Sequence, residues 1–191
     1  LSPYFQSTIH IHFFYDKEEI KVIEKNILNA RELGCHGVVV GAHDQNFKLD
    51  ISLLKRWKTL AGPMYITFHR AFDVLVSPLE AISQLIDLDF DCLLTSGQKE
   101  KAEAGIENLI YWNTKFGSDI IIMPGSGVGV SNCKKFKKAG FKYIHLSAGE
   151  DLQPIPMPDG INQNLSFLKQ KIRHSDKQTL IEVVKSLKSV E

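Results

Sequence analysis

The stretch "MYITFHRAFD" at residues 64–73 decides how this chain is expected to fold. Its first part is rich in β-branched and aromatic residues, which is typical of a buried strand. Apolar strands usually end in turn residues, whereas this one ends in His69 and Arg70, with Asp73 three residues further on. These ionisable side chains are therefore either a functional site or a solvated strand end.

The chain contains five more runs of strand-like composition. They occupy residues 8–14, 37–42, 91–97, 119–127 and 143–149, and glycine, aspartate or proline bounds most of them. Most successive runs are separated by about 27 residues, which is the length of a strand, a helix and two loops.

The segments between these runs are expected to be helices. Asp16 precedes an amphipathic segment at 17–34 and, with Glu19, forms a capping-box pattern. Asp50 can cap a helix that ends at Gly62. Further helices are predicted at 77–88, 100–117, 131–140 and, at the C-terminal side, 175–189.

Strands that alternate with helices predict a parallel sheet covered by helices, either doubly wound or a TIM-type (β/α)8 barrel. No GxGxxG follows the first run, and the regular period with polar strand ends favours the barrel. About six of eight βα units are visible, so two more are expected before Leu1. Residues 1–191 are expected to form one partial barrel domain, with a C-terminal extension at 151–191.

Composition narrows the class of protein. The net charge is +1, from 23 basic and 22 acidic residues, so neither nucleic acid nor a membrane is predicted as a partner. The N-terminal residues resemble no signal peptide. Cys35, Cys92 and Cys133 are widely spaced and form no CxxC, which favours a reduced, cytoplasmic location. The sequence is compatible with a homo-oligomer and does not decide the oligomeric state.

Alternation along the strands places polar side chains on one face. Tyr65, Thr67 and His69 share one parity, and the runs at 8–14 and 143–149 repeat the pattern with histidines. In a barrel this parity points inward, and its C-terminal ends line the mouth where barrel enzymes carry their chemistry. The predicted cluster contains His69, Thr95, Ser96 and Ser147 at strand ends, His145 slightly deeper, and Arg70 and Asp73 at the rim.

Three interpretations of this cluster are open. His69 and Asp73 could be a catalytic acid/base pair in which Asp73 orients the imidazole. His10, His12, His69 and His145 could be metal ligands. The third interpretation is structural, with hydrogen-bonded barrel histidines and a salt bridge between Arg70 and Asp73.

The turn "PGSGVGVSN" at 124–132 is a second signal. A glycine-rich turn after a strand offers backbone N–H groups to an anion. With Arg70 on the rim, Gly125, Ser126, Gly127 and the segment 147–149 form a predicted phosphate or carboxylate site. The alternative is that the glycines serve only the geometry of the turn.

Four blocks together resemble the CutC family of copper homeostasis proteins. They are "TFHRAFD" at 67–73, "LLTSG" at 93–97, "IIMPGSGV" at 121–128 and "HLSAG" at 145–149. The resemblance covers residues 8–150 and implies a TIM barrel, a cytoplasmic location and copper ion binding. The family's first two βα units, and the cysteines proposed there as copper ligands, have no counterpart here, so the metal ligands are unknown. An Arg-Pro-Arg-Gly-Gly run of the family is also missing between His12 and Phe13.

The resemblance and the residues together give two main hypotheses. The first is a cytoplasmic CutC-type protein that binds or traffics copper. The alternative is a barrel enzyme for a small phosphorylated or carboxylated metabolite, with His69 and Asp73 as acid/base and Arg70 with Gly125–Gly127 as the anion site. Copper(I) prefers thiolate and thioether ligands, whereas the matching residues offer hard donors. A third hypothesis is a chain too short to function.

Overall fold

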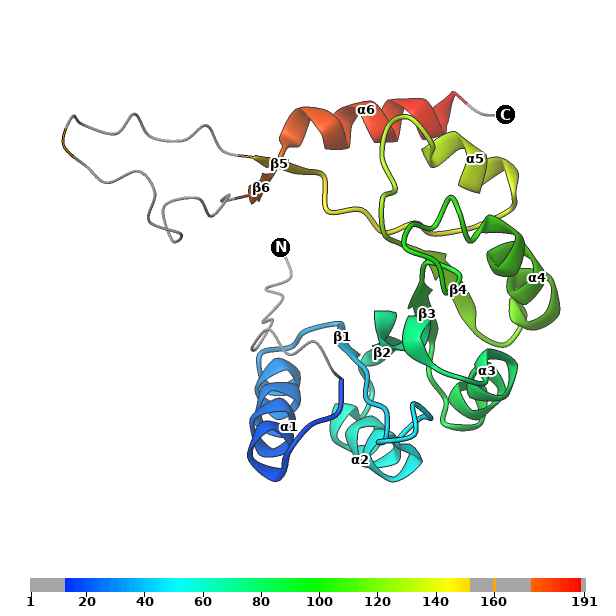
Figure 1. Ribbon diagram of the computed structural model, residues 1–191. Coiled ribbons are helices and arrows are strands. Elements are labelled where there is room, and N and C mark those ends of the chain that lie inside the picture. Colours follow the sequence, from blue (N-terminus) through cyan, green and yellow to red (C-terminus); the bar gives the residue numbers. More distant parts are fainter. Residues whose placement is uncertain (1–12, 152–159, 161–172, 190–191) are drawn as a thin grey trace.

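A computed structural model describes residues 13–151, 160 and 173–189 of the 191-residue chain. Four strands, β1 (Gly37–Val40), β2 (Tyr65–Phe68), β3 (Cys92–Thr95) and β4 (Ile121–Pro124), form a parallel sheet in the order β1-β2-β3-β4. Between and around them lie α1 (Lys17–Glu32), α2 (Ile51–Ala61), α3 (Pro78–Asp87), α4 (Ile106–Phe116) and α5 (Cys133–Lys138). Figure 1 shows these helices along the outer side of an arc, with the strands inside. The described residues therefore form part of a barrel wall.

The predicted helix starts are largely confirmed. The Asp16 carboxylate accepts from the backbone N–H groups of Glu18 and Glu19, and the Glu19 side chain accepts from the backbone of Asp16, which completes the capping box. Asp50 accepts from the backbone N–H of Leu53. These bonds satisfy donors that the first turn of a helix otherwise leaves unpaired.

The alternation predicted for the strand after Met64 is also confirmed. Ile66 and Phe68 are fully buried beneath the helices, and each contributes roughly 2 kcal/mol of burial. On the opposite face, Tyr65 is 67% exposed and Val39 is 40% exposed. The face that would line a closed barrel is therefore open to solvent over part of its width.

The run at 143–149 does not form the strand that its composition predicts. It starts beside the end of β4, where the backbone N–H of His145 donates to Pro124 at 2.9 Å. Only β5 (Gly149–Asp151) is extended and paired, antiparallel to β6 (Arg173–Ser175). The described residues supply no ladder along the other edge of 143–148, and a strand is stabilised by such pairing. The run predicted at 8–14 lies mostly outside the described residues, and Phe13 and Phe14 are not in a strand.

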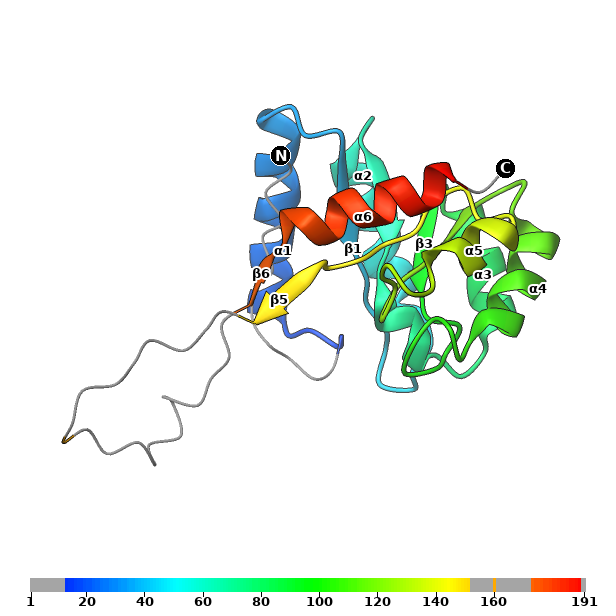
Figure 2. The same ribbon diagram turned by 90° about the horizontal axis from the view of Figure 1, so that it is seen from above.

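The last helix, α6 (Lys177–Lys188), is held against α5. The side chain of Lys137 donates to the carbonyl of Leu187 at 2.6 Å, and Figure 2 shows the two helices side by side. Within the described part of the chain, no helix is long and apolar enough to cross a membrane.

Candidate functional site

Asp73 lies at the centre of a hydrogen-bonded cluster at the end of β2. The chain after β2 turns into a short 3₁₀ helix, η1 (Arg70–Val74), in which side chains three residues apart lie over one another. Arg70 Nε therefore donates to Asp73 Oδ2 at 2.7 Å. The Asp73 side chain is 8% exposed, and that of Arg70 is 40% exposed. The salt bridge of the structural interpretation is present.

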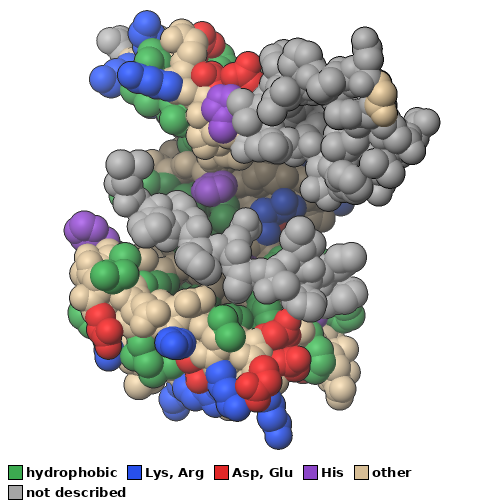
Figure 3. All heavy atoms as spheres, turned by 90° about the vertical axis from the view of Figure 1, so that its left-hand side faces the viewer, with side chains coloured by type: hydrophobic (Ala, Val, Ile, Leu, Met, Phe, Trp, Pro, Cys, Tyr) green, Lys and Arg blue, Asp and Glu red, His purple; other side chains and the backbone are tan. Residues whose placement is uncertain are grey.

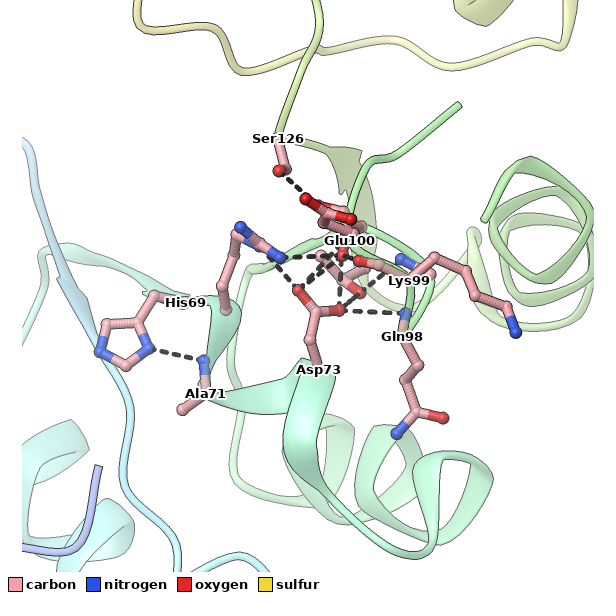
Figure 4. Close-up of polar contacts among 11 residues, drawn as sticks. His69, Ala71, Asp73, Gln98, Lys99, Glu100 and Ser126 are labelled. Carbon is pink, nitrogen blue, oxygen red and sulfur yellow. Dashed lines mark hydrogen bonds and ion pairs between the residues drawn. The ribbon is translucent and has the colours of Figure 1, made fainter. Parts of the chain in front are cut away.

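The end of β3 supplies the other partners of this carboxylate. The Thr95 hydroxyl donates to Asp73 Oδ1 at 2.5 Å, and the Ser96 hydroxyl donates to Asp73 Oδ2 at 3.0 Å. The backbone N–H groups of Ser96 and Gln98 also point at it (Figure 4). Asp73 thus joins two neighbouring strand ends, and Thr95 and Ser96 act as its partners.

His69 makes a separate set of contacts. Its Nδ1 accepts from the backbone N–H of Ala71 at 3.1 Å, and its ring lies on Phe13 with centroids 4.6 Å apart. Figure 4 shows the imidazole directed away from Asp73. The predicted pairing in which Asp73 orients His69 is therefore not formed, because η1 places Asp73 over Arg70.

Burial sets the charge state of His69. Desolvation lowers its pKa to about 4, so the ring is neutral near pH 7. Since Nδ1 accepts a hydrogen bond, the proton of the neutral ring is on Nε2. The ring also fills the space that a side chain at position 41 would need, because a Cβ built on Gly41 would lie 2.4 Å from Nδ1.

Arg70 keeps donors to spare. Beyond Asp73, its Nη2 donates to the Ser96 hydroxyl at 3.1 Å. A guanidinium carries five N–H donors, and among the described residues only Nε and Nη2 of Arg70 have hydrogen-bond acceptors. Its orientation is fixed while part of it stays accessible, which is what bidentate binding of a carboxylate or phosphate needs.

The glycine-rich turn after β4 is built from backbone. Ser126 and Gly127 both have positive φ, at 85° and 68°. The Ser126 hydroxyl donates to the carbonyl of Glu100, and the carbonyl of Ser126 accepts from Ala102 (Figure 4). The N–H groups of 126–128 donate to no described residue, whereas that of Gly125 bonds to Thr95. Three adjacent N–H groups of this turn therefore have no acceptor among the described residues.

The remaining predicted residues follow β4. A Cβ built on Gly125 would lie 3.4 Å from His145 Cβ, so His145 is beside the turn. Desolvation lowers the pKa of His145. Ser147 is used locally, because its hydroxyl accepts from the backbone N–H of Gly149.

The thiols do not gather into a metal site. Cys133 is fully buried and Cys92 is 8% exposed, with a pKa that desolvation raises to about 11. In the described ranges, no three His, Cys, Asp or Glu side chains come together as metal ligands. The candidates His10 and His12 lie outside those ranges. The donors that are described do not fit a soft copper(I) centre.

Two further residues near the strand ends are not among the candidates selected from the sequence. Lys101 lies against the β4 turn, because a Cβ built on Gly127 would lie 3.1 Å from its stem, and its sequence context gives no signal. His43 directly follows the run at 37–42, which is a signal that could have been used. It is 3% exposed, and Nδ1 donates to the carbonyl of Asp44 at 2.7 Å, leaving Nε2 without a partner in the described structure.

Comparison with known proteins identifies the family to which this chain belongs. The profile of the CutC family matches residues 9–150. The chain belongs to the CutC family. A CutC family protein of Edwardsiella ictaluri is 40% identical over 137 residues, which is 72% of this chain and 54% of that protein. One of Bacteroides fragilis is 38% identical over 142 residues, covering 74% of this chain and 57% of that protein. The chain thus spans about half the length of the curated relatives it matches.

Solved structures agree with the partial barrel. The crystal structure of CutC from Streptococcus agalactiae, whose description assigns it provisionally to copper homeostasis, is similar with a TM-score of 0.67 and 27% identity. It matches 70% of this chain and 66% of that one. A structure described as native KDPGal has a TM-score of 0.53 at 13% identity, covers 93% of this chain and 66% of its own, and supports the fold alone. The α/β barrel-type fold predicted from the sequence is confirmed, as is the resemblance to CutC.

Proposed function

We propose that this CutC family chain binds, at the C-terminal ends of its strands, a small phosphorylated or carboxylated metabolite, as a barrel enzyme does. The observation that carries the proposal is Arg70. Its guanidinium is positioned by Asp73 and Ser96 and has N–H groups with no described acceptor, and the side chain as a whole is 40% exposed. A surface arginine that served stability alone would not need one partner in its own turn and a second at the end of the neighbouring strand to fix its orientation.

The turn after β4 and the basic side chains near it also favour binding of an anion. The N–H groups of 126–128 donate to no described residue, and Lys101 adds a positive charge beside this turn. Figure 3 looks onto the open side of the arc and shows a histidine and basic side chains in the hollow. In this arrangement Asp73 positions Arg70, and His69 adds a neutral imidazole whose Nδ1 is bonded to the backbone N–H of Ala71.

The test is calorimetric titration of the chain with inorganic phosphate and with acetate. Arg70→Gln should weaken both by about tenfold or more, because a charge-assisted bidentate contact is lost. Arg56→Gln is the matched control, since Arg56 pairs with Glu24 on the outer helices. No binding to the unaltered chain, or equal binding by Arg70→Gln, would refute the proposal.

Copper binding or trafficking is the second candidate, and the family's name supports it. Its ligands would have to include thiols, and Cys35 is the only one of the three that is not buried. The test is a competition titration with copper(I) on the chain and on a triple variant in which Cys35, Cys92 and Cys133 are all replaced by serine. If the thiols play no part, the two proteins should have the same copper(I) affinity. A clear loss in the triple variant would favour the copper function.

A further inference from the structure

We propose that the loop at the end of β3 is a preformed binding site for a small carboxylate, and that Asp73 fills it as a tethered ligand. A free carboxylate such as formate would bind the same donors when position 73 carries no carboxyl group. The inference does not rest on the proposed function, because it concerns the donors that Asp73 already occupies and not the N–H groups of Arg70 that have no described acceptor.

The donors match the two oxygens of the Asp73 carboxylate (Figure 4). Its Oδ1 lies 2.5 Å from the Thr95 hydroxyl, and 3.1 and 3.2 Å from the backbone nitrogens of Ser96 and Gln98. Its Oδ2 lies 2.7 Å from Arg70 Nε, and 3.0 and 3.2 Å from the hydroxyl and the backbone nitrogen of Ser96. Hydrogen bonds to a charged acceptor are the strong ones, and here they converge on a planar group with two acceptor atoms. An anion of a single atom, such as chloride, would leave part of this set unpaired.

The loop that carries most of these donors is held by contacts that do not involve the carboxylate. The Thr95 hydroxyl accepts from the backbone N–H of Gly97 at 3.0 Å, which directs its own hydrogen toward the site. Gly97 and Gln98 have positive φ, at 75° and 56°, a conformation in which loop N–H groups can face one anion. The Gln98 side chain donates to the carbonyl of Leu75 at 2.6 Å. A Cβ built on Gly97 would lie 2.4 Å from the carbonyl oxygen of Gly105, so the loop backbone packs directly on that segment.

The site is shielded from water and contains a positive charge. Thr95 and Ser96 are fully buried, and the Asp73 side chain is 8% exposed. Buried donors bind an acceptor more strongly than exposed ones and are costly when they have none. Removal of the carboxyl group alone would leave these donors and the Arg70 guanidinium without their acceptor. An added carboxylate would restore both the hydrogen bonds and the charge pair.

Two substitutions at position 73 provide the test. Asp73→Ala removes the carboxyl group and leaves space equivalent to formate, whereas Asp73→Asn fills the same space with an uncharged amide. Both variants are titrated with sodium formate at neutral pH and constant ionic strength, and binding is followed by calorimetry, by the urea midpoint and by the amide NMR signals of Ser96 and Gln98. Sodium chloride and sodium propionate are the control salts, because the carbon chain of propionate would overlap the alanine methyl group.

We expect formate to bind Asp73→Ala with about millimolar affinity, about tenfold or more tightly than it binds Asp73→Asn. Formate should raise the urea midpoint of Asp73→Ala more than either control salt does, because a ligand that binds only the folded state stabilises it. The Ser96 and Gln98 amide signals should move with formate in Asp73→Ala and not in Asp73→Asn. Equal effects of formate on the two variants, or no effect on Asp73→Ala, would overturn the inference.

A second measurement applies if Asp73→Ala does not fold in buffer alone. Refolding in formate should then give more folded protein than refolding in chloride at the same concentration, as judged by circular dichroism. An equal yield in the two salts would also overturn the inference. Failure of the unaltered chain to bind phosphate or acetate would overturn the proposed function instead, and would leave the formate result unaffected.

Discussion

The ends of β2 and β3 and the turn after β4 border the same mouth, yet they are built from different parts of the chain. At β2 and β3 the structure depends on side chains, because the Asp73 carboxylate collects donors from Arg70, Thr95, Ser96 and Gln98. At the β4 turn the structure depends on the backbone, through positive φ at Ser126 and Gly127 and N–H groups that donate to no described residue.

This difference indicates which substitutions each region tolerates. A buried carboxylate with several partners leaves them all unsatisfied when it is removed, so the β2–β3 ends should be sensitive to residue identity. A turn that presents N–H groups keeps them under most side-chain changes. Positioning of a charged side chain and display of backbone N–H groups would be two routes to the anion binding that we propose.

The largest effect is expected from Asp73→Ala. Removing the carboxylate should cost about 3 kcal/mol in the free energy of unfolding, below the full value for a buried pair because Arg70 is partly exposed. Phosphate binding should fall as well, since Arg70 loses its support. Urea denaturation and calorimetry measure both, with the exposed Asp87→Asn as control. A loss under about 1 kcal/mol would show that the cluster is not a structural unit.

A pH titration tests the burial of His69 in the same region. Burial holds its pKa near 4 in the folded chain, against 6.5 for an unburied histidine, so the unfolded state binds the proton first as the pH falls. The stability that the neutral His69 ring gives the folded state is fully present above pH 6.5 and is lost progressively toward pH 4. The free energy of unfolding should therefore fall by about 2 kcal/mol between pH 7 and pH 5. His145, whose pKa is also lowered, adds in the same direction.

The measurement is the urea midpoint at the two pH values. His69→Asn should make the midpoint less dependent on pH, whereas His36→Asn, at an exposed position, should not change that dependence. Identical slopes for His69→Asn and the unaltered chain would mean that the ring titrates normally and is solvated.

Much of the fold was readable from the sequence, because the deciding interactions are local. The cap at Asp16 lies within three residues of its partners, and the alternation of Ile66 and Phe68 reports directly which face is buried. The segment 143–148 was mispredicted, because its strand-like composition cannot show whether a neighbour exists on both sides.

The candidate site was readable in its residues but not in its pairings. His69, Arg70, Asp73, Thr95 and Ser96 were all selected from the sequence. The sequence left two partners open for Asp73, His69 and Arg70, and the 3₁₀ turn favours the residue three positions away, Arg70. The bonds from Thr95 and Ser96 come from more than twenty residues away. Such contacts depend on strand order, which local spacing does not encode.

A pair of glycine substitutions sharpens the contrast between the two regions. A Cβ at position 41 would strike the His69 ring, which Ala71 and Phe13 hold, so Gly41→Ala should cost about 1–2 kcal/mol. A Cβ at position 125 would lie 2.4 Å from the terminal methyl of Leu94, which can move, and no closer than 3.4 Å to His145, so Gly125→Ala should cost less. Gly129→Ala, with nothing within 4 Å of its Cβ, is the control for thermal or urea unfolding. Equal costs at 41 and 125 would contradict a rigid β2 end.

The smallest effect is expected at Ser126. Ser126→Ala removes a partly exposed hydrogen bond from its hydroxyl to the carbonyl of Glu100, so the loss of stability should stay below about 1 kcal/mol. Phosphate affinity should change by less than about twofold, because the N–H groups of the turn stay in place while the backbone keeps its positive φ. Calorimetry beside Arg70→Gln gives the comparison. If Ser126→Ala weakened phosphate as much as Arg70→Gln does, the hydroxyl and not the backbone would be the donor, and the two regions would bind anions by side chains alike.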